Sequence, residues 1–397
     1  MEPCRCGWIS SPRWKLPVYA VRGGAGFPTH LKMRAVRDAT HSRMRRRPAI
    51  LVANGTEGEP ASNKDKLLLT HSPHLVIDGI VAAAVAVGAQ RAILCVERRY
   101  RLSLEPAYRA PRQRSEQEPV AVEVAETPSR YVAGEETALV SWLNGRAARP
   151  TFVPPRPFES GVGGAPTLMV NVETLGHIAW IARFGAEQFR LAGETTEPGT
   201  MIVTIAGAVS RPSVREIDIG SPLAAILDQA GAEAPSAVLL SGYFGTWISA
   251  AQAASALFST GELRPLGASL GCGVIAVMPE TRRDGHCPLH DLGAAVRWLA
   301  SNSAGQCGPC TNGLPAIAEA FAATIAGDHS GRSDALLDRW GPMIAGRGAC
   351  KLPDGALRFI DSARRVFASH IDEHHARGPC PPNLRQLLPT PNLGPWR

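Results

Sequence analysis

A glycine-rich loop near the N-terminus is the first candidate for a ligand-binding segment. Gly23, Gly24 and Gly26 fall within four consecutive positions, ahead of a sequence that can open a helix. Glycines let a backbone turn tightly and come close to a ligand. The N–H groups of such a loop, at the start of a helix, suit a phosphate or an electron-rich ring. A surface turn is the alternative interpretation of the same residues.

A second polar loop, Asn54-Gly-Thr-Glu-Gly-Glu-Pro60, strengthens the case for a ligand. Glu57 and Glu59 stand beside glycine and proline, which suits a rigid loop facing a ribityl or ribose hydroxyl. For each glutamate considered alone, the alternative is an ordinary solvent-exposed charge in a loop, with no ligand.

Three cysteines have positions suited to iron. Cys307-Gly-Pro-Cys310 lies where one expected helix ends and the next begins, and Cys350 lies in another interhelical loop. Thiolates presented from loops at one end of a helical bundle can converge on an iron–sulfur cluster, because iron there requires soft sulfur ligands. A redox dithiol or an inert pair, with Cys350 as a small buried residue, is the alternative.

The composition indicates a globular protein of two or three domains. The chain has 397 residues, 45% of them hydrophobic and 19% charged. It contains no apolar run of bilayer-spanning length and no stretch typical of a signal peptide. These features predict a cytoplasmic protein with no direct membrane insertion. Nine cysteines, an odd number, favour thiols or metal ligation over a disulfide framework.

The net charge of +7 comes mostly from arginine. It fits a docking face for an acidic electron carrier such as a ferredoxin, or simply an arginine-rich composition. The basic run at residues 43–47 lacks interleaved aromatic residues, so nucleic acid is not an expected partner.

The elements that must position these residues fall into three successive groups. The first alternates strands with a helix and predicts an α/β fold with a mainly parallel sheet. The second, strand–strand–helix–strand, fits a β-grasp module or an extra layer of the first domain. The third has apolar positions three and four apart and predicts a helical bundle. The expected strands are 50–52, 92–96, 120–124, 202–209 and 237–240, and the expected helices 76–89, 222–230, 292–301, 314–326, 333–344 and 355–374.

Taken together, the motifs resemble one family: the flavin-bearing, NADH-oxidising subunit of bacterial respiratory complex I and the diaphorase subunits of NAD-linked hydrogenases and formate dehydrogenases. The resemblance covers nearly the whole chain. It is carried by residues 22–32, 54–60, 64–65, 73–74, 131–139, 164–167, 171–174 and 303–310.

The resemblance implies a domain organisation. A Rossmann-like α/β domain binding FMN and NADH is expected over residues 1–192. A β-grasp (ubiquitin-like) domain of the soluble-ligand-binding type should follow over 193–284, and a helical bundle with an iron–sulfur site over 285–378. The remaining residues, 379–397, are expected to form a loose tail.

Site residues follow from the same resemblance, position by position. No residue is expected to act as acid or base, because the cofactor performs the chemistry. The expected flavin-lining residues are Gly23, Gly24, Gly26, Lys32, Asn54, Glu57, Tyr131, Gly134, Glu135, Asn171 and Thr174. Phe27, Glu59 and Glu136 are expected to meet NADH, and Cys307, Cys310 and Cys350 to hold the metal cluster.

The chain departs from the family pattern at the cluster, where Ala304 replaces the usual first cysteine. Three thiolates suit a [3Fe–4S] cluster or a [4Fe–4S] cluster with one iron not bound by cysteine. Cys272 and Cys287 are candidate replacement ligands, and absence of the cluster is the remaining alternative.

The nucleotide loop also departs, with Val153 in place of a lysine and Arg156 in place of an aromatic residue. The leading hypothesis is that NADH reduces FMN, which passes electrons to the cluster and to an iron–sulfur or ferredoxin-like partner protein. Two alternatives are an FMN protein that exchanges electrons with a ferredoxin without NADH, and a non-catalytic structural subunit.

Overall fold

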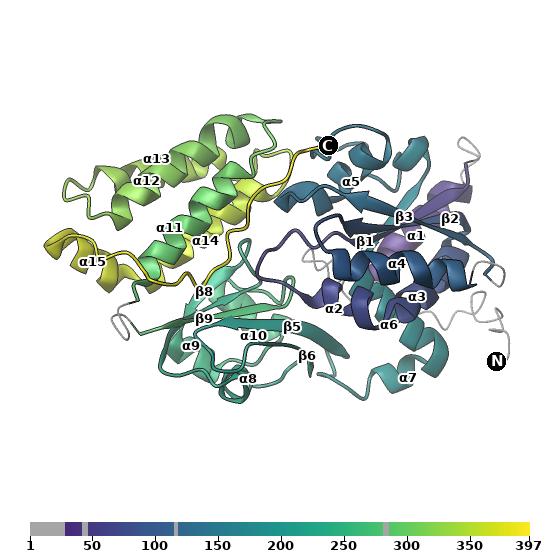
Figure 1. Cartoon of the computed structure of the whole chain (residues 1–397), viewed down its shortest axis with the longest axis horizontal. Helices are drawn as coiled ribbons and strands as arrows, with labels where there is room; N and C mark the ends of the chain where they lie inside the picture. Colours follow the sequence, from purple (N-terminus) through teal and green to yellow (C-terminus); the bar gives the residue numbers. More distant parts are fainter. Residues whose placement is uncertain (1–27, 42–46, 115–117, 281–285) are drawn as a thin grey trace.

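The computed structural model describes residues 28–41, 47–114, 118–280 and 286–397. Figure 1 shows three groups of elements in space: a sheet covered by helices, a second sheet, and a set of long helices beside it. They follow one another in this order along the chain.

The first sheet has four parallel strands in the spatial order β3-β2-β1-β4. The predicted α/β fold with a parallel sheet is therefore confirmed. Because β1 lies between β2 and β4, the chain reverses its direction across the sheet beside β1. The strands are β1 (Ala49–Gly55), β2 (Ala89–Glu97), β3 (Ala121–Thr127) and β4 (Thr167–Asn171).

Both faces of this sheet are covered, as the alternation along β1 shows. Leu51 and Ala53 are buried in a cluster with residues of α1, α3, α4 and α6. Val52 points to the other face, where it packs with Leu139 of α5. Successive residues of a strand face opposite sides, so both clusters need apolar residues. The helices are α1 (Thr29–His41), α3 (Pro73–Val87), α4 (Arg101–Arg114), α5 (Glu136–Leu143) and α6 (Val172–Phe184).

The second sheet is mixed, with the order β6-β5-β9-β7-β8. Within the described ranges β5 and β9 are its one parallel pair, and the other three pairs are antiparallel. One face of the sheet packs on α8 and α9, and the other packs on the C-terminal helices. The elements are β5 (Thr200–Gly207), β6 (Ser213–Asp218), α8 (Leu223–Ala230), β7 (Pro235–Leu240), β8 (Thr246–Ser249), α9 (Ala250–Ser255), α10 (Thr260–Leu263) and β9 (Val274–Pro279).

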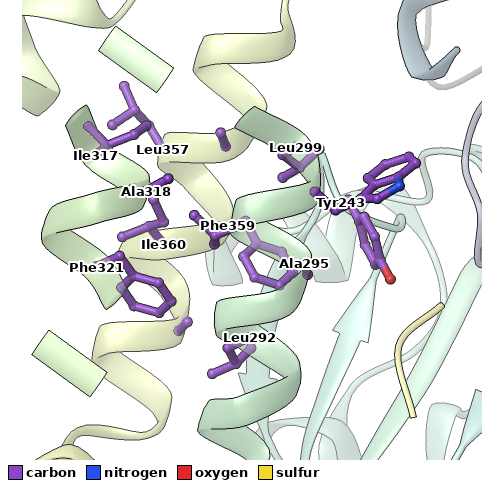
Figure 2. Close-up of a cluster of buried hydrophobic side chains, with 14 of the residues drawn as sticks. Tyr243, Leu292, Ala295, Leu299, Ile317, Ala318, Phe321, Leu357, Phe359 and Ile360 are labelled. Atoms are coloured by element: carbon purple, nitrogen blue, oxygen red, sulfur yellow. The ribbon is translucent and has the colours of Figure 1, made fainter. Parts of the chain in front are cut away.

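The C-terminal helices share one core, in which Phe321, Phe359 and Ile360 are buried (Figure 2). Tyr243, which follows β7 of the second sheet, packs edge-on against Phe359 with ring centroids 5.9 Å apart. The helix expected over residues 355–374 is interrupted at Phe367, which lies outside helical geometry at the end of α14. The helices are α11 (Pro288–Ser301), α12 (Leu314–Ile325), α13 (Arg332–Ile344), α14 (Leu352–Val366) and α15 (Ala368–Arg377).

The segment after α15, expected to be a loose tail, has neither helix nor strand and crosses the molecule to the neighbourhood of α5 (Figure 1). We call residues 379–397 the C-terminal strap. Along the strap, Tyr243 Oη donates to the Pro389 carbonyl at 2.7 Å and Trp298 Nε1 to the Pro391 carbonyl at 2.7 Å. At its end, Ala148 N donates to the Trp396 carbonyl at 3.2 Å. The strap thus contacts all three groups of elements.

Helix α3 lies unusually close to α6. A Cβ atom at Gly79 would stand 2.0 Å from the carbonyl oxygen of Leu175, so only glycine allows this approach. Helix α2 (Lys64–His71) precedes α3 at a bend of 98°. In the described ranges, no single helix is long and apolar enough to cross a membrane; by length and composition only this bent pair passes such a test.

We expect Gly79→Ala to destabilise the protein by about 1–3 kcal/mol or more, because the backbones of α3 and α6 must separate. Gly176→Ala is the matched control on α6, since its Cβ would meet Leu75 at an ordinary 3.6 Å. Urea unfolding of both variants measures the difference. Equal stability of the two would contradict the close packing described.

Candidate functional site

The carboxyl edge of the parallel sheet carries the polar residues expected at the cofactor. Asn54 is the last residue but one of β1 and pairs in register with Asn171, which ends β4. Open α/β sheets bind ligands outside the carboxyl ends of their strands, where the strand order reverses. In this sheet the strand order reverses beside β1, so a ligand site is expected there.

Two helices begin at this edge, each with a capping side chain. Glu135 accepts hydrogen bonds from Thr137 N and Ala138 N, both at 3.0 Å, at the start of α5. Asn171 accepts from Glu173 N at 3.0 Å at the start of α6. Asn54 Nδ2 donates to the carbonyl of Gly134 at 2.8 Å, which ties the segment before α5 to the end of β1. The positive ends of both helix dipoles therefore lie near one point of the sheet.

The first turn of α1 joins this group. Lys32 Nζ lies 3.1 Å from a carboxylate oxygen of Glu136, the first residue of α5. In the same turn, buried Thr29 Oγ1 and His30 Nδ1 have no hydrogen-bond partner among the residues that the structure describes. Buried polar atoms are normally paired. These groups, a lysine and three helix starts fit a ligand with an anionic group and several hydroxyls, such as FMN.

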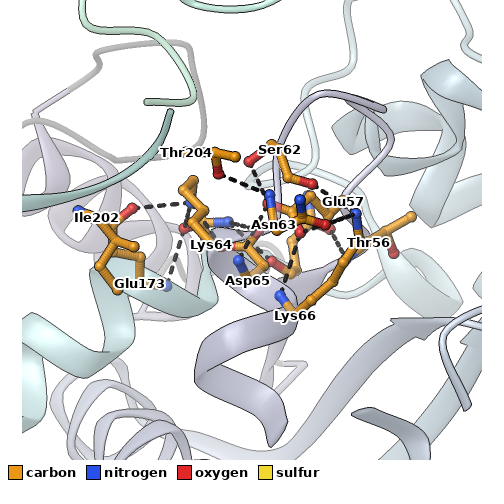
Figure 3. Close-up of polar contacts among 12 residues, drawn as sticks. Thr56, Glu57, Ser62, Asn63, Lys64, Asp65, Lys66, Glu173, Ile202 and Thr204 are labelled. Atoms are coloured by element: carbon orange, nitrogen blue, oxygen red, sulfur yellow. Dashed lines mark hydrogen bonds and ion pairs between the residues drawn. The ribbon is translucent and has the colours of Figure 1, made fainter. Parts of the chain in front are cut away.

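A buried charge cluster fixes the loop between β1 and α2 (Figure 3). Lys64 Nζ lies 2.7 Å from Asp65 Oδ1 and 2.9 Å from Glu173 Oε2, and it donates to Asn171 Oδ1 at 3.1 Å. Burial alone would lower the pKa of Lys64, but the carboxylates of Asp65 and Glu173 raise it above its ordinary value. Lys64 therefore stays charged, and it joins the start of α2 to the start of α6.

The cluster also reaches the second sheet. Glu173 Oε1 accepts from Ile202 N of β5 at 2.7 Å, and Asn63 N donates to Thr204 Oγ1 at 2.9 Å. The relative position of the two sheets is therefore set by buried polar bonds as well as by apolar contact.

Glu57, expected to line the flavin, is directed inward. Its carboxylate accepts from the Ser62 hydroxyl, from Asp65 N at 3.2 Å and from Lys66 N at 3.3 Å. Burial and the nearby Asp65 raise the pKa of Glu57. These bonds hold the first turn of α2, so Glu57 shapes the loop after β1.

Glu59 and Tyr131 form a polar contact with the second unit. Tyr131 Oη donates to Glu59 Oε2 at 2.9 Å, and Tyr243 N donates to the same oxygen at 2.8 Å. Burial raises the pKa of Glu59 to about 7, although its hydrogen bonds oppose the shift. The Tyr131 ring packs edge-on against Phe244 and Trp298, with ring centroids 4.7 and 5.3 Å away.

The structure thus separates the expected residues into groups. Lys32, Asn54, Gly134, Glu135, Glu136 and Asn171 come together at the sheet edge, and Thr174 is buried in the first turn of α6. Glu57, Glu59 and Tyr131 face neighbouring protein groups instead. Gly23, Gly24, Gly26 and Phe27 lie outside the described residues. Sequence reasoning gave no role to Lys64, Asp65 and Glu173, although charged residues next to the polar loop were a signal.

The three expected cluster ligands lie in one region. Cys310 and Cys350 are buried in the same core, and Cys307 packs against it. A hydrogen bond from Cys350, opposed by burial, lowers the pKa of Cys310 to about 6, and the backbone N–H of Ala304 contributes. Cys310 lies within a π-helical turn, Pro309–Gly313, and Cys307 lies two residues before that turn. Three soft donors at one place fit an iron–sulfur cluster.

The position at which the resemblance predicts the first cysteine carries an apolar residue. Ala304 is buried in the same core as Cys310 and Cys350. The proposed replacements are engaged elsewhere, since Cys272 Sγ donates to the Ser241 carbonyl at 3.0 Å and Cys287 Sγ lies 3.1 Å from His370 Nε2. Both thiols thus have other partners here, and their role as replacement cluster ligands stays a prediction.

The cysteine region adjoins the sheet edge. The pKa of Cys350 is raised by a hydrogen bond to Cys310 and by burial, and the nearby Glu135 carboxylate adds to the shift. Tyr131 N donates to Asn302 Oδ1 at 3.0 Å, directly before the loop that holds Cys307. The two expected redox sites are therefore neighbours.

Replacing Lys64 should be costly, because two buried carboxylates lose their cation. We expect Lys64→Met to lower the free energy of unfolding by about 3–5 kcal/mol near pH 8. The loss should shrink towards pH 5, because burial raises the pKa of Asp65 and its carboxylate then takes up a proton in the folded variant. Lys66→Met, on the same helix with a more exposed ammonium, is the control and should cost less. Urea unfolding at both pH values measures the effect, and equal losses would contradict it.

Glu59 should give a pH dependence of its own. Its pKa is about 7 in the folded protein and near 4.5 ordinarily, so the folded state holds an extra proton between these values. The free energy of unfolding must therefore fall as pH rises through this window, by at most about 1.4 kcal/mol per pH unit. Glu59→Gln should remove this slope in urea unfolding series from pH 4.5 to 7. An unchanged slope would show that Glu59 is ionised throughout.

Comparison with known proteins identifies the lineage. The family model described as the Nuo51 FMN-binding domain matches residues 20–180, and that of the NADH-ubiquinone oxidoreductase-F iron–sulfur binding region matches residues 292–374. The second F-type subunit of the NADH-quinone oxidoreductase of Rhizobium meliloti (strain 1021) is 28% identical over 372 residues, which are 89% of this chain and 86% of the relative.

Hydrogenase subunits are similar over a part of their length. The alpha subunit of the NAD-reducing hydrogenase HoxS of Cupriavidus necator is 28% identical, over 91% of this chain and 60% of that protein. The crystal structure of NAD⁺-reducing [NiFe]-hydrogenase in the H2-reduced state aligns with a TM-score of 0.77 and 30% identity, covering 90% of this chain and 61% of that one. The present chain thus spans about three fifths of these hydrogenase subunits.

The first family match includes the glycine loop and the sheet edge, and the second includes all three cluster cysteines. These matches confirm the family that the motifs indicated. They also confirm the prediction of an FMN-dependent, NADH-oxidising enzyme with an iron–sulfur region. The chain belongs to the family of FMN-bearing, NADH-oxidising subunits of complex I and of NAD-reducing hydrogenases.

Proposed function

We propose that this chain oxidises NADH at an FMN bound along the carboxyl edge of the parallel sheet. The observation that supports this most strongly is the meeting of α1, α5 and α6 beside Asn54 and Asn171. FMN, when bound, accepts a hydride and releases electrons singly, which is the chemistry this family needs. The protein residues bind, orient and exclude water.

The side chains at the sheet edge would contribute to FMN binding in different ways. Lys32 supplies a cation, and the polar atoms of Thr29 and His30 that lack a partner in the described part of the chain supply hydrogen bonds. Asn54, Glu135 and Asn171 line the cradle and hold its loops through their backbone bonds. Gly23, Gly24 and Gly26 would add backbone donors, and Gly134 and Thr174 would add further contacts. Glu57 and Tyr131 would position the loops behind the cradle through their bonds to neighbouring protein groups.

NADH would approach from the side of Glu136, with Phe27 and Glu59 as the other contacts. Glu136 is partly exposed, as a residue that meets a substrate must be, and its present partner is Lys32. Glu59 is buried and bonded to Tyr131 and Tyr243, so its role would be to position the loop rather than to touch a ribose.

Cys307, Cys310 and Cys350 would hold the electron-accepting cluster, as a [3Fe–4S] cluster or as a [4Fe–4S] cluster with one iron that lacks a cysteine ligand. The closeness of Cys350 to Glu135 supports direct transfer between the two cofactors. An iron–sulfur or ferredoxin-like partner protein would take the electrons onward, guided by the net charge of +7.

The finer domain division belongs to the same proposal. A Rossmann-like domain would cover residues 1–192, a β-grasp domain 193–284 and the iron–sulfur bundle 285–378. The mixed five-stranded sheet with one helix between β6 and β7 supports the β-grasp assignment. A cytoplasmic location stays a prediction.

A second candidate function takes electrons from a reduced ferredoxin in place of NADH. It is favoured by the loop after α5, where Phe152 and Val153 are exposed and Arg156 replaces an aromatic residue.

Anaerobic stopped-flow mixing of the FMN-reconstituted protein with NADH separates these functions. We expect the yellow flavin absorbance to bleach within one turnover, because the donor transfers two electrons directly. Bleaching by reduced ferredoxin but not by NADH would support the second candidate. If the protein binds flavin but neither donor bleaches it, the remaining alternative is a non-catalytic structural subunit.

Ala304→Cys should restore a fourth thiolate at the cluster. We expect the iron content of anaerobically purified protein to rise towards about four per chain, with loss of any three-iron EPR signal. Ala300→Cys, which adds a thiol to the same core from α11, is the control and should change neither. An unchanged iron content together with an unchanged EPR spectrum in Ala304→Cys would mean that position 304 does not face the cluster.

A further inference from the structure

Four side chains that commonly bind metals meet at the far end of the helical bundle. Cys287 precedes α11, His370 and His374 lie one turn apart on α15, and Cys380 follows at the start of the C-terminal strap. Cys287, His370 and His374 are buried and Cys380 is partly buried. None of them belongs to the flavin or iron–sulfur sites described above.

The distances between the donor atoms match a single four-coordinate ion. Cys287 Sγ lies 3.1 Å from His370 Nε2 and 3.6 Å from His374 Nε2, and Cys380 Sγ lies 3.9 Å from His370 Nε2. All four donor atoms lie within 4.8 Å of one another. A tetrahedral zinc ion with ordinary Zn–S and Zn–N bonds holds sulfur and nitrogen about 3.5 Å apart.

Both imidazoles are oriented by groups behind them. His374 Nδ1 lies 2.6 Å from the Ile325 carbonyl, so it carries the proton and leaves a lone pair on Nε2. Cys380 N donates to that Nε2 at 3.2 Å, which agrees with this tautomer, and a bound ion would take the lone pair in place of this hydrogen bond. His370 Nδ1 faces the Glu373 carboxylate at 3.5 Å. A carbonyl or carboxylate behind a histidine is the usual support of a metal ligand.

We propose that Cys287, His370, His374 and Cys380 form a structural Zn²⁺ site. Two thiolates and two imidazoles are a donor set that zinc prefers, and four protein ligands leave no open position for a substrate. Binding displaces the two thiol protons to solvent. The close spacing suits one ion and not an iron–sulfur cluster, whose ligands stand on separate irons.

The surroundings of the site anchor the strap. Asn383 Oδ1 accepts from Cys287 N at 2.8 Å, and Asn383 Nδ2 donates to Asp291 Oδ2 at 2.9 Å. Asp291 Oδ1 accepts from Leu387 N at 2.6 Å and Leu388 N at 2.9 Å. The metal and this network together fix the strap where it leaves α15.

The proposed site would hold the C-terminal strap in place between the helical bundle and the α/β unit. From the zinc site the strap runs past Tyr243 and Trp298 to the α/β unit, where Gly394 N donates to the Ser129 carbonyl at 3.1 Å. Loss of the ion would release the strap at its origin, and its contacts with the α/β unit would open more often. Zinc therefore stabilises the junction of the iron–sulfur bundle with the flavin domain.

Metal analysis of purified protein tests the site without any assay of activity. We expect about one zinc ion per chain, counted separately from iron. Cys380→Ser and His374→Gln should each lose most of the zinc and retain iron and FMN. His375→Gln and Cys272→Ser replace a neighbouring histidine and a non-ligand thiol, and both should retain the zinc.

Spectroscopy keeps the test decisive if a ligand variant fails to fold. Cobalt(II) exchanged into the wild-type protein should show the intense visible bands of a tetrahedral site with thiolate ligands. Hydrogen exchange of residues 380–397 should speed up when a chelator removes zinc, and readdition of Zn²⁺ should reverse the change.

Three results would overturn the proposal. One is wild-type protein without zinc that cannot take up Zn²⁺ or cobalt. Another is a Cys287–Cys380 disulfide in protein purified under anaerobic conditions. The third is zinc content that Cys380→Ser and His374→Gln leave unchanged.

Discussion

The ammonium group of Lys64, buried among carboxylates, is the interaction on which the rest of the structure depends. It draws together Asp65 of α2, Asn171 at the end of β4 and Glu173 of α6. A charge without water is stable only if its partners surround it. Because Glu173 also bonds the backbone of β5, this one cation fixes the cofactor edge and the position of the second sheet.

Polar residues at the edge serve largely to fix its geometry. Glu57, Glu135 and Asn171 each satisfy N–H groups at the start of a helix, so their carboxylate and amide oxygens are already engaged. Three features are left to bind a ligand. They are the positive ends of the helix dipoles, the Lys32 cation, and the polar atoms of α1 that have no partner among the described residues. This division explains how a loop rich in acidic residues can accept a cofactor that carries a phosphate.

The sequence predicted the parallel sheet, the helical C-terminal part and the meeting of Asn54 with Asn171, because periodicity and ordered motifs report local structure and edge position. It did not predict the charge cluster, since the burial of Lys64 depends on residues more than a hundred positions away. The metal-binding group at Cys287 was missed for the same reason, because His370 and His374 lie 83 and 87 positions further along the chain. The break at Phe367 escaped detection because the apolar spacing continues from α14 into α15.

The position of the bound flavin is the central claim, and a structure of the FMN-reconstituted protein measures it directly. We predict the phosphate beside the first turns of α1, α5 and α6, and the flavin ring between Asn171 and the cysteine region. Flavin density at another surface of the protein, or a sheet edge filled by the chain's own side chains after reconstitution, would contradict this claim.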